Sequence, residues 1–206
     1  NVQLVAVSKT KPATDIQALY DLGHRDFGEN YVQELSEKAG QLPADIRWHF
    51  IGHLQSNKVK YIAPFVHLIH GVDSFRLLQE INKQAMKNNR SIDCLLQVHI
   101  AREETKFGLD EQELEKILEE PAFSQLKHVR VRGLMGMASF TDDQDAVRIE
   151  FRYLKELFQR LSPKFGPAFN ELSMGMSSDY SIAVEEGSTM VRVGSLLFGA
   201  RKYEKK

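Results

Sequence analysis

Two stretches near opposite ends of the chain carry the residue types that could do chemistry. Near the start, the apolar run of "LVAVSKTKP" stops at Lys9. Near the end, "SMGMSSD" contains Ser177, and "TMVRVGSLL" contains Gly194 and Ser195. A lysine amine can form a Schiff base with an aldehyde, while Gly/Ser loops can bind phosphate through hydroxyls and backbone N–H groups. Together they indicate a ligand that carries both an aldehyde and a phosphate.

Pyridoxal 5′-phosphate (PLP) has both groups, and the arginine inside the last strand suits it. A lone lysine after a strand is usually a solvated charge, and a lone Gly/Ser loop is usually a turn, so only the combination is informative. The amine attacks in its neutral form, which partial burial at a strand end favours. Lys11 follows after the strand has ended, and we expect it to be exposed.

Arg192 is a charged residue within the apolar run "TMVRVG". Such a residue must be paired or must face a site, so a structural ion pair is the alternative to a ligand contact. If the cofactor lies between Lys9 and the C-terminal loops, Arg192 could face its pyridine nitrogen, which would then stay unprotonated. Asn30, in "FGEN", could contact the cofactor ring or cap the following helix.

The histidines give weaker signals. His49 and His53 are four residues apart, a spacing that binds metal only on a helix face, and "WHFIGH" indicates a strand. We therefore expect no metal site, and His53 remains a candidate for lining the pocket. His67 and His70 flank a strand and are expected to be structural.

Short apolar runs alternate with helical spacing along the whole chain. The expected strands are Leu4–Ser8, Asp26–Gly28, Trp48–Ile51, Leu68–Gly71, Cys94–Ile100, Val129–Met135, Glu171–Met174 and Met190–Val193. The expected helices are Thr14–Leu22, Val32–Ala39, Gln55–Ala63, Ser74–Asn88, Asp110–Glu120, Ala146–Leu161 and Asp179–Glu186. Strands that are apolar on both faces favour a parallel sheet covered by helices. Eight units predict a single (β/α)8 TIM barrel over residues 1–206, with an open doubly wound sheet as the alternative.

Composition excludes several classes of function. The chain has 27 basic and 28 acidic residues, so we expect no nucleic-acid partner. No apolar run approaches the ~20 residues that span a bilayer, and we expect no signal peptide or membrane contact. Cys94 is the single cysteine, which favours a reducing, cytoplasmic location. The first methionine is Met86, so we expect a segment upstream of Asn1.

Five motifs in order resemble the pyridoxal 5′-phosphate homeostasis protein family, a PLP-binding barrel like the N-terminal domain of alanine racemase. They are "LVAVSKTKP", "FGENYVQE", "WHFIGHLQSNK", "LSMGMSSD" and "STMVRVGSLLFGAR", which extends to Arg201. The resemblance implies that Lys9 forms the Schiff base and that Asn30 lines the ring. It also implies that Arg192 faces the pyridine nitrogen and that Ser177, Gly194 and Ser195 hold the phosphate. The family commonly has threonine at the position of Ser195, and it has a helix before the first strand that is missing here.

Members of this family bind PLP and are implicated in vitamin B6 and amino-acid homeostasis, so we expect a carrier or regulator without appreciable turnover. PLP-dependent apo-enzymes are its candidate recipients, and we expect a monomer. The alternative is an amino-acid racemase, which needs a base on each face of the substrate. In alanine racemase a tyrosine from an additional domain supplies the second base, and we expect no such domain after Arg201. A Schiff-base aldolase is less favoured, because no acid/base pair accompanies Lys9.

Overall fold

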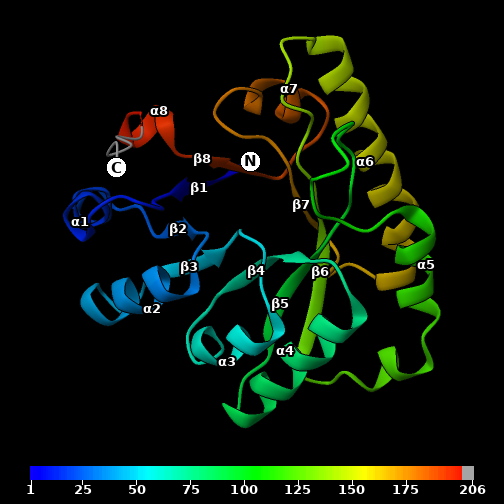
Figure 1. Ribbon diagram of the computed structural model, residues 1–206, viewed down its shortest axis with the longest axis horizontal. Helices are drawn as coiled ribbons and strands as arrows, with labels where there is room; N and C mark the ends of the chain where they lie inside the picture. Colours follow the sequence, from blue (N-terminus) through cyan, green and yellow to red (C-terminus); the bar gives the residue numbers. More distant parts are fainter. Residues whose placement is uncertain (201–206) are drawn as a thin grey trace.

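The strands form a closed parallel barrel in the computed structural model, which describes residues 1–200 (Figure 1). Within that range, eight strands pair in chain order, and the last pairs with the first. They are β1 (Gln3–Val7), β2 (Asp26–Glu29), β3 (Arg47–Phe50), β4 (Leu68–Val72), β5 (Ile92–Gln97), β6 (Val129–Met135), β7 (Glu171–Ser173) and β8 (Met190–Val193). The predicted (β/α)8 barrel is confirmed, and the open sheet is excluded.

Helices connect the strands and lie around the barrel (Figure 1). The α-helices are α1 (Ala13–Asp21), α2 (Val32–Gln41), α3 (Val59–Ile62), α4 (Phe75–Lys87), α5 (Glu111–Glu119), α6 (Gln144–Phe165), α7 (Tyr180–Glu185) and α8 (Ser195–Phe198). The 3₁₀ turns are η1 (Ser56–Lys58) and η2 (Pro121–Gln125). Local signals start the longer helices: Ser74 caps α4, and Asp110 forms a capping box with Glu113 in α5. Among residues 1–200, no helix is long and apolar enough to cross a membrane.

Barrel closure brings the two ends of the described chain together. β1 pairs in parallel with β8, from Gln3 opposite Met190 to Ala6 opposite Val193. The segment after β1 therefore lies beside α8, as Figure 1 shows for the blue and red parts of the ribbon. Residues far apart in the sequence thus meet at the C-terminal ends of the strands, where barrel enzymes place their sites.

The interior of the barrel is polar in part, and the prediction of strands that are apolar on both faces is wrong there. Val5, Leu68, Leu95, Met135 and Met190 form a small apolar cluster, separate from the larger core. A second group of buried strand residues is polar: Asp26, His49, His70, Ser173 and Arg192. His70 of β4 contacts Ser173 of β7, and these strands are not neighbours, so the contact crosses the barrel interior.

Most element boundaries differ from the predicted ones by one or two residues, and three differences are larger. β5 ends at Gln97 rather than Ile100, because the chain then loops out and Leu109 returns to donate to the Gln97 carbonyl oxygen. The predicted helix Gln55–Ala63 is a 3₁₀ turn followed by the short α3. α6 is longer than predicted and begins after Asp143, whose side chain caps it.

Candidate functional site

All six residues predicted for the site line one cavity of about 380 Å³ at the C-terminal ends of the strands. They are Lys9, Asn30, Ser177, Arg192, Gly194 and Ser195. Val7, Ile51, Met137 and Met176 form apolar parts of the wall. The cavity therefore combines an amine, a guanidinium and a Gly/Ser loop with apolar surface, as a small aromatic phosphate would require.

Ser8 holds the chain immediately before Lys9. Its N–H donates to the Gly28 carbonyl oxygen at 3.0 Å, and its hydroxyl donates to Glu29 Oε1 at 3.0 Å. Its carbonyl oxygen accepts from Lys38 Nζ at 2.8 Å. Ser8 is fully buried, whereas Lys9 is half-buried at the cavity wall. The strand end thus presents Lys9 from a rigid backbone.

Sequence reasoning missed the buried ion pair that supports this strand end. Lys38 Nζ contacts Glu29 Oε1 at 2.5 Å and Glu34 Oε1 at 2.7 Å. Burial raises the pKa of Glu29 to about 7, in opposition to the neighbouring ammonium. Glu34 also accepts from the Thr10 N–H at 2.6 Å. The four-residue spacing of Glu34 and Lys38 was the available signal, but it does not show that Lys38 reaches β1.

Lys11 is half-buried and engaged, so the prediction of an exposed side chain is wrong. Its Nζ donates to the carbonyl oxygens of Phe198 at 3.1 Å, Gly199 at 3.3 Å and Ala200 at 3.4 Å. These carbonyls lie at the C-terminal end of α8, which attracts a cation. Lys11 therefore ties the segment after β1 to α8.

The loops after β7 and β8 meet in the cavity. Gly194 N–H donates to Ser177 Oγ at 3.3 Å, and Ser195 begins α8, whose first N–H groups have no acceptor within the helix. Gly175 has φ +103°, and a Cβ there would lie 2.6 Å from the Ala183 Cβ. Glycine is therefore required for the chain to turn after β7. The two loops place hydroxyls and backbone donors together.

Arg192 is buried on the cavity wall and has neutral partners. Its Nη1 donates to Ser173 Oγ at 2.5 Å, and its Nη2 donates to the Gly136 carbonyl oxygen at 3.2 Å. Neither partner is a carboxylate, so these contacts are not the structural ion pair considered from the sequence. Burial lowers the pKa of Arg192 to about 10, and the guanidinium remains protonated at neutral pH.

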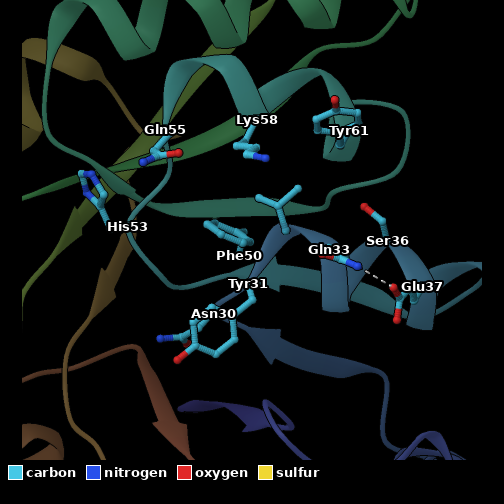
Figure 2. Close-up of a pocket in the computed structure, with 11 residues that line it drawn as sticks. Asn30, Tyr31, Gln33, Ser36, Glu37, Phe50, His53, Gln55, Lys58 and Tyr61 are labelled. Carbon is cyan, nitrogen blue, oxygen red and sulfur yellow. Dashed lines mark hydrogen bonds between the residues drawn. The ribbon is translucent and has the colours of Figure 1, made fainter.

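Asn30 lies between this cavity and a second one of about 570 Å³, which Figure 2 shows. The alternative role of Asn30 as a helix cap is wrong, because α2 has Tyr31 at its N-cap without a side-chain hydrogen bond. Within residues 1–200, the Asn30 Oδ1 is buried and has no hydrogen-bond partner. His53 lines the second cavity rather than the first, and its ring stacks on Phe107 at 3.9 Å.

His49 and His70 have a structural arrangement inside the barrel. His49 Nδ1 lies 2.9 Å from His70 Nε2, and His49 Nε2 lies 2.9 Å from Asp26 Oδ1. Asp26, His49 and His67 bring ligand atoms within 4.8 Å of one another. However, Arg47 already donates twice to the Asp26 carboxylate, at 2.9 and 2.6 Å. The guanidinium would therefore compete with a metal ion for the Asp26 carboxylate.

Comparison with known proteins identifies the family. The family model described as "Alanine racemase, N-terminal domain" matches residues 1–202. The pyridoxal phosphate homeostasis protein of Aquifex aeolicus is 44% identical, over 98% of this chain and 88% of that protein. The chain belongs to the pyridoxal phosphate homeostasis protein family. The resemblance indicated by the five motifs is thus confirmed, and only their last residue, Arg201, lies outside the described residues.

Solved structures agree with this membership of the pyridoxal phosphate homeostasis protein family. PipY of Synechococcus elongatus PCC7942 with PLP bound is 40% identical, with a TM-score of 0.86 over 96% of this chain and 92% of that chain. Alanine racemase from Bartonella henselae is 18% identical, with a TM-score of 0.72 over 96% of this chain and 56% of that chain. The latter likeness shows the shared barrel fold alone.

Proposed function

We propose that this protein binds pyridoxal 5′-phosphate as a Schiff base on Lys9 and serves PLP (vitamin B6) and amino-acid homeostasis without appreciable turnover. The observation that carries the proposal is the single cavity that unites Lys9, Arg192 and the Ser177–Gly194–Ser195 loops. PLP bound to PipY, and the homeostasis name of the relatives, support it.

The donor set fits the cofactor group by group. Ser177, Gly194 and Ser195 would hold the phosphate through hydroxyls and N–H groups. Arg192 would donate to the pyridine nitrogen, and the unpaired Asn30 Oδ1 would accept from the ring substituents. PLP supplies an aldehyde whose carbon can form a C=N bond with an amine, with loss of one water. Lys9 is the amine that we assign to it.

A carrier fits the cavity better than a racemase. Racemisation needs a base on each face of the substrate Cα. The second amine on the cavity wall, Lys11, already donates to three carbonyl oxygens. Among the described residues that line the cavity, none is a tyrosine. In this proposal the protein is a cytoplasmic monomer, and PLP-dependent apo-enzymes receive the cofactor.

Reduction of the PLP-loaded protein with borohydride tests the attachment. We expect absorption of the bound cofactor before reduction, and a pyridoxyl adduct at Lys9 in peptide mass spectra afterwards. Lys9→Ala should abolish the adduct, and Lys11→Ala, the matched control, should retain it. An adduct on Lys11 would overturn the assignment.

Two further experiments test the phosphate site and the absence of turnover. The Ser177→Ala/Ser195→Ala double variant should weaken PLP retention, and unchanged affinity would refute the role of these hydroxyls. The wild type should not exchange the Cα hydrogen of alanine with solvent deuterium. Efficient exchange that Lys9→Ala abolishes would establish the racemase instead.

A further inference from the structure

We propose that Ser173 and His70 are positioning residues that hold Arg192 toward the cofactor, through a one-way hydrogen-bond chain that crosses the barrel. The expected effect of these residues on cofactor binding rests on the proposed PLP site. The chain itself is a property of the protein alone and can be tested without the cofactor.

The chain consists of four successive contacts between buried side chains. Arg192 Nη1 lies 2.5 Å from Ser173 Oγ, which lies 2.9 Å from His70 Nδ1. His70 Nε2 lies 2.9 Å from His49 Nδ1, and His49 Nε2 lies 2.9 Å from Asp26 Oδ1. All five residues are buried, so each polar group needs a hydrogen-bond partner within the protein. The series runs from the wall of the cofactor cavity to Asp26, the first residue of β2.

The two ends of the chain determine its direction. A guanidinium only donates, so Ser173 Oγ accepts from Arg192 and gives its own hydrogen to His70 Nδ1. His70 must then carry its proton on Nε2 and donate to His49 Nδ1. His49 in turn carries its proton on Nε2 and donates to the Asp26 carboxylate, which only accepts. With both rings neutral, this direction makes each histidine an Nε2–H tautomer.

Burial lowers the pKa of both histidines and so favours the same neutral state, while Asp26 and Glu171 act on His49 in the opposite direction. Arg192 near one end and Arg47 at the other disfavour a further positive charge between them. The rings of His49 and His67 also meet, with centroids 5.3 Å apart. Asp26 is the carboxylate in direct contact with the chain, and Arg47 shares it through two hydrogen bonds. The carboxylate that is hydrogen-bonded within the chain therefore lies at the far end from the cofactor cavity, while Asp179 attracts the Arg192 guanidinium electrostatically.

This arrangement fixes Arg192 through two neutral hydrogen-bond partners. Ser173 and the Gly136 carbonyl oxygen orient two nitrogens of the guanidinium. A carboxylate in place of Ser173 Oγ or of the Gly136 carbonyl oxygen would neutralise the guanidinium charge that would otherwise face the pyridine nitrogen. Removal of the Ser173 hydroxyl would leave Nη1 without its partner and allow the guanidinium to rotate away from its position.

Nitrogen-15 NMR of the histidine rings in the cofactor-free wild type tests the chain directly. We expect Nε2–H signals and unprotonated Nδ1 signals for both His49 and His70, unchanged between about pH 8 and pH 6. An Nδ1–H tautomer or an imidazolium for either ring in this range would overturn the one-way chain. This measurement requires no variant that might fail to fold.

Cofactor titration of two matched serine variants tests the consequence for Arg192. Ser173→Ala should weaken PLP affinity about tenfold and shift the absorption band of the bound cofactor. Ser188→Ala is the control, because it also removes a buried hydroxyl, one that contacts the carbonyl oxygens of Leu172, Met174 and Met190. It should keep the wild-type affinity and spectrum.

The outcomes separate the two proposals. If the wild type binds no PLP, the proposed function fails, whatever the NMR result. If the wild type binds PLP and Ser173→Ala matches it in affinity and spectrum, the positioning role is overturned. If Ser188→Ala shows the same loss as Ser173→Ala, the effect comes from a buried hydroxyl in general and the positioning role is also overturned.

Discussion

The buried histidines should make the unfolding free energy of this protein depend on pH, and substitution of one of them should reduce that dependence. His49 and His70 are both fully buried, and burial lowers the pKa of each. The perturbation is His70→Asn, which replaces a titrating ring with a neutral amide. The quantity to compare is the change in unfolding free energy between about pH 7.5 and about pH 5.5.

The sign follows from which state takes up protons. An unfolded histidine titrates near ~6.5, whereas the folded, buried ring takes no proton until a lower pH. Stability from this group is therefore complete above the unfolded pKa and falls as the pH drops below it. Over the chosen interval, His70 should reduce the unfolding free energy by about 1.4 kcal/mol, because burial holds its folded pKa well below the ordinary value. His70→Asn should abolish this contribution of His70 to the decrease in unfolding free energy.

Glu29 changes the unfolding free energy with pH in the opposite direction to the histidines. The pH dependence of the wild type alone therefore does not reveal the contribution of His70. Burial raises the pKa of this carboxyl to about 7, and the folded state then binds a proton more readily than the unfolded state. Stability from this group rises as the pH falls from about 7. The contribution of Glu29 cancels when the variant is compared with the wild type.

Urea unfolding at the two pH values provides the assay. We expect the wild type to lose about 1.4 kcal/mol more than His70→Asn between them, whatever the overall destabilisation of the variant. His53→Asn is the matched reference variant, because the His53 side chain is 39% exposed and lies outside the buried hydrogen-bond chain. Equal pH dependence of the wild type and His70→Asn would refute the reasoning.

Three further changes give distinct expected results. Lys11→Met should remove the hydrogen bonds from Lys11 Nζ to the end of α8 and increase amide hydrogen exchange at Gly199. Unchanged exchange would contradict the attachment of the segment after β1 to α8. Gly175→Ala should lower the unfolding free energy, measured by thermal unfolding, by about 1–3 kcal/mol, because Gly175 has a positive φ. Gly40→Ala is the matched control: there is open space around its Cβ position and no positive φ, so this variant should be more stable by about 0.5 kcal/mol. Lys38→Met should cost about 3 kcal/mol at pH 8 and less at pH 6, where Glu29 can take a proton, and equal costs at both pH values would contradict the buried ion pair.

The position of the site was predictable because it depends on strand ends. Parallel strands place their C-terminal ends on one face, so Lys9 after the first apolar run and Gly194 after the last had to share a rim. Arg192 was identifiable because a charged residue within a buried strand must be paired or must face a site. These inferences need the order of the strands but not the packing of individual side chains.

The contacts across the barrel were not predictable from local pattern. His70 and Ser173 belong to strands that are not neighbours, and nothing in their spacing shows that they meet. Lys38 likewise extends from a helix to β1, a contact set by the packing of α2. The end of β5 was misplaced because apolar residues continue past Gln97, while the chain itself turns out of the sheet.

Pairing of β1 with β8 has a consequence for biosynthesis of the protein. The amine of Lys9 is synthesised 185 residues before the loop at Gly194 and Ser195, which completes the cavity. The cofactor cavity cannot exist on a growing chain until β8 has left the ribosome and closed the barrel. Under the proposed function, capture of the cofactor by Lys9 therefore begins only after β8 is in place.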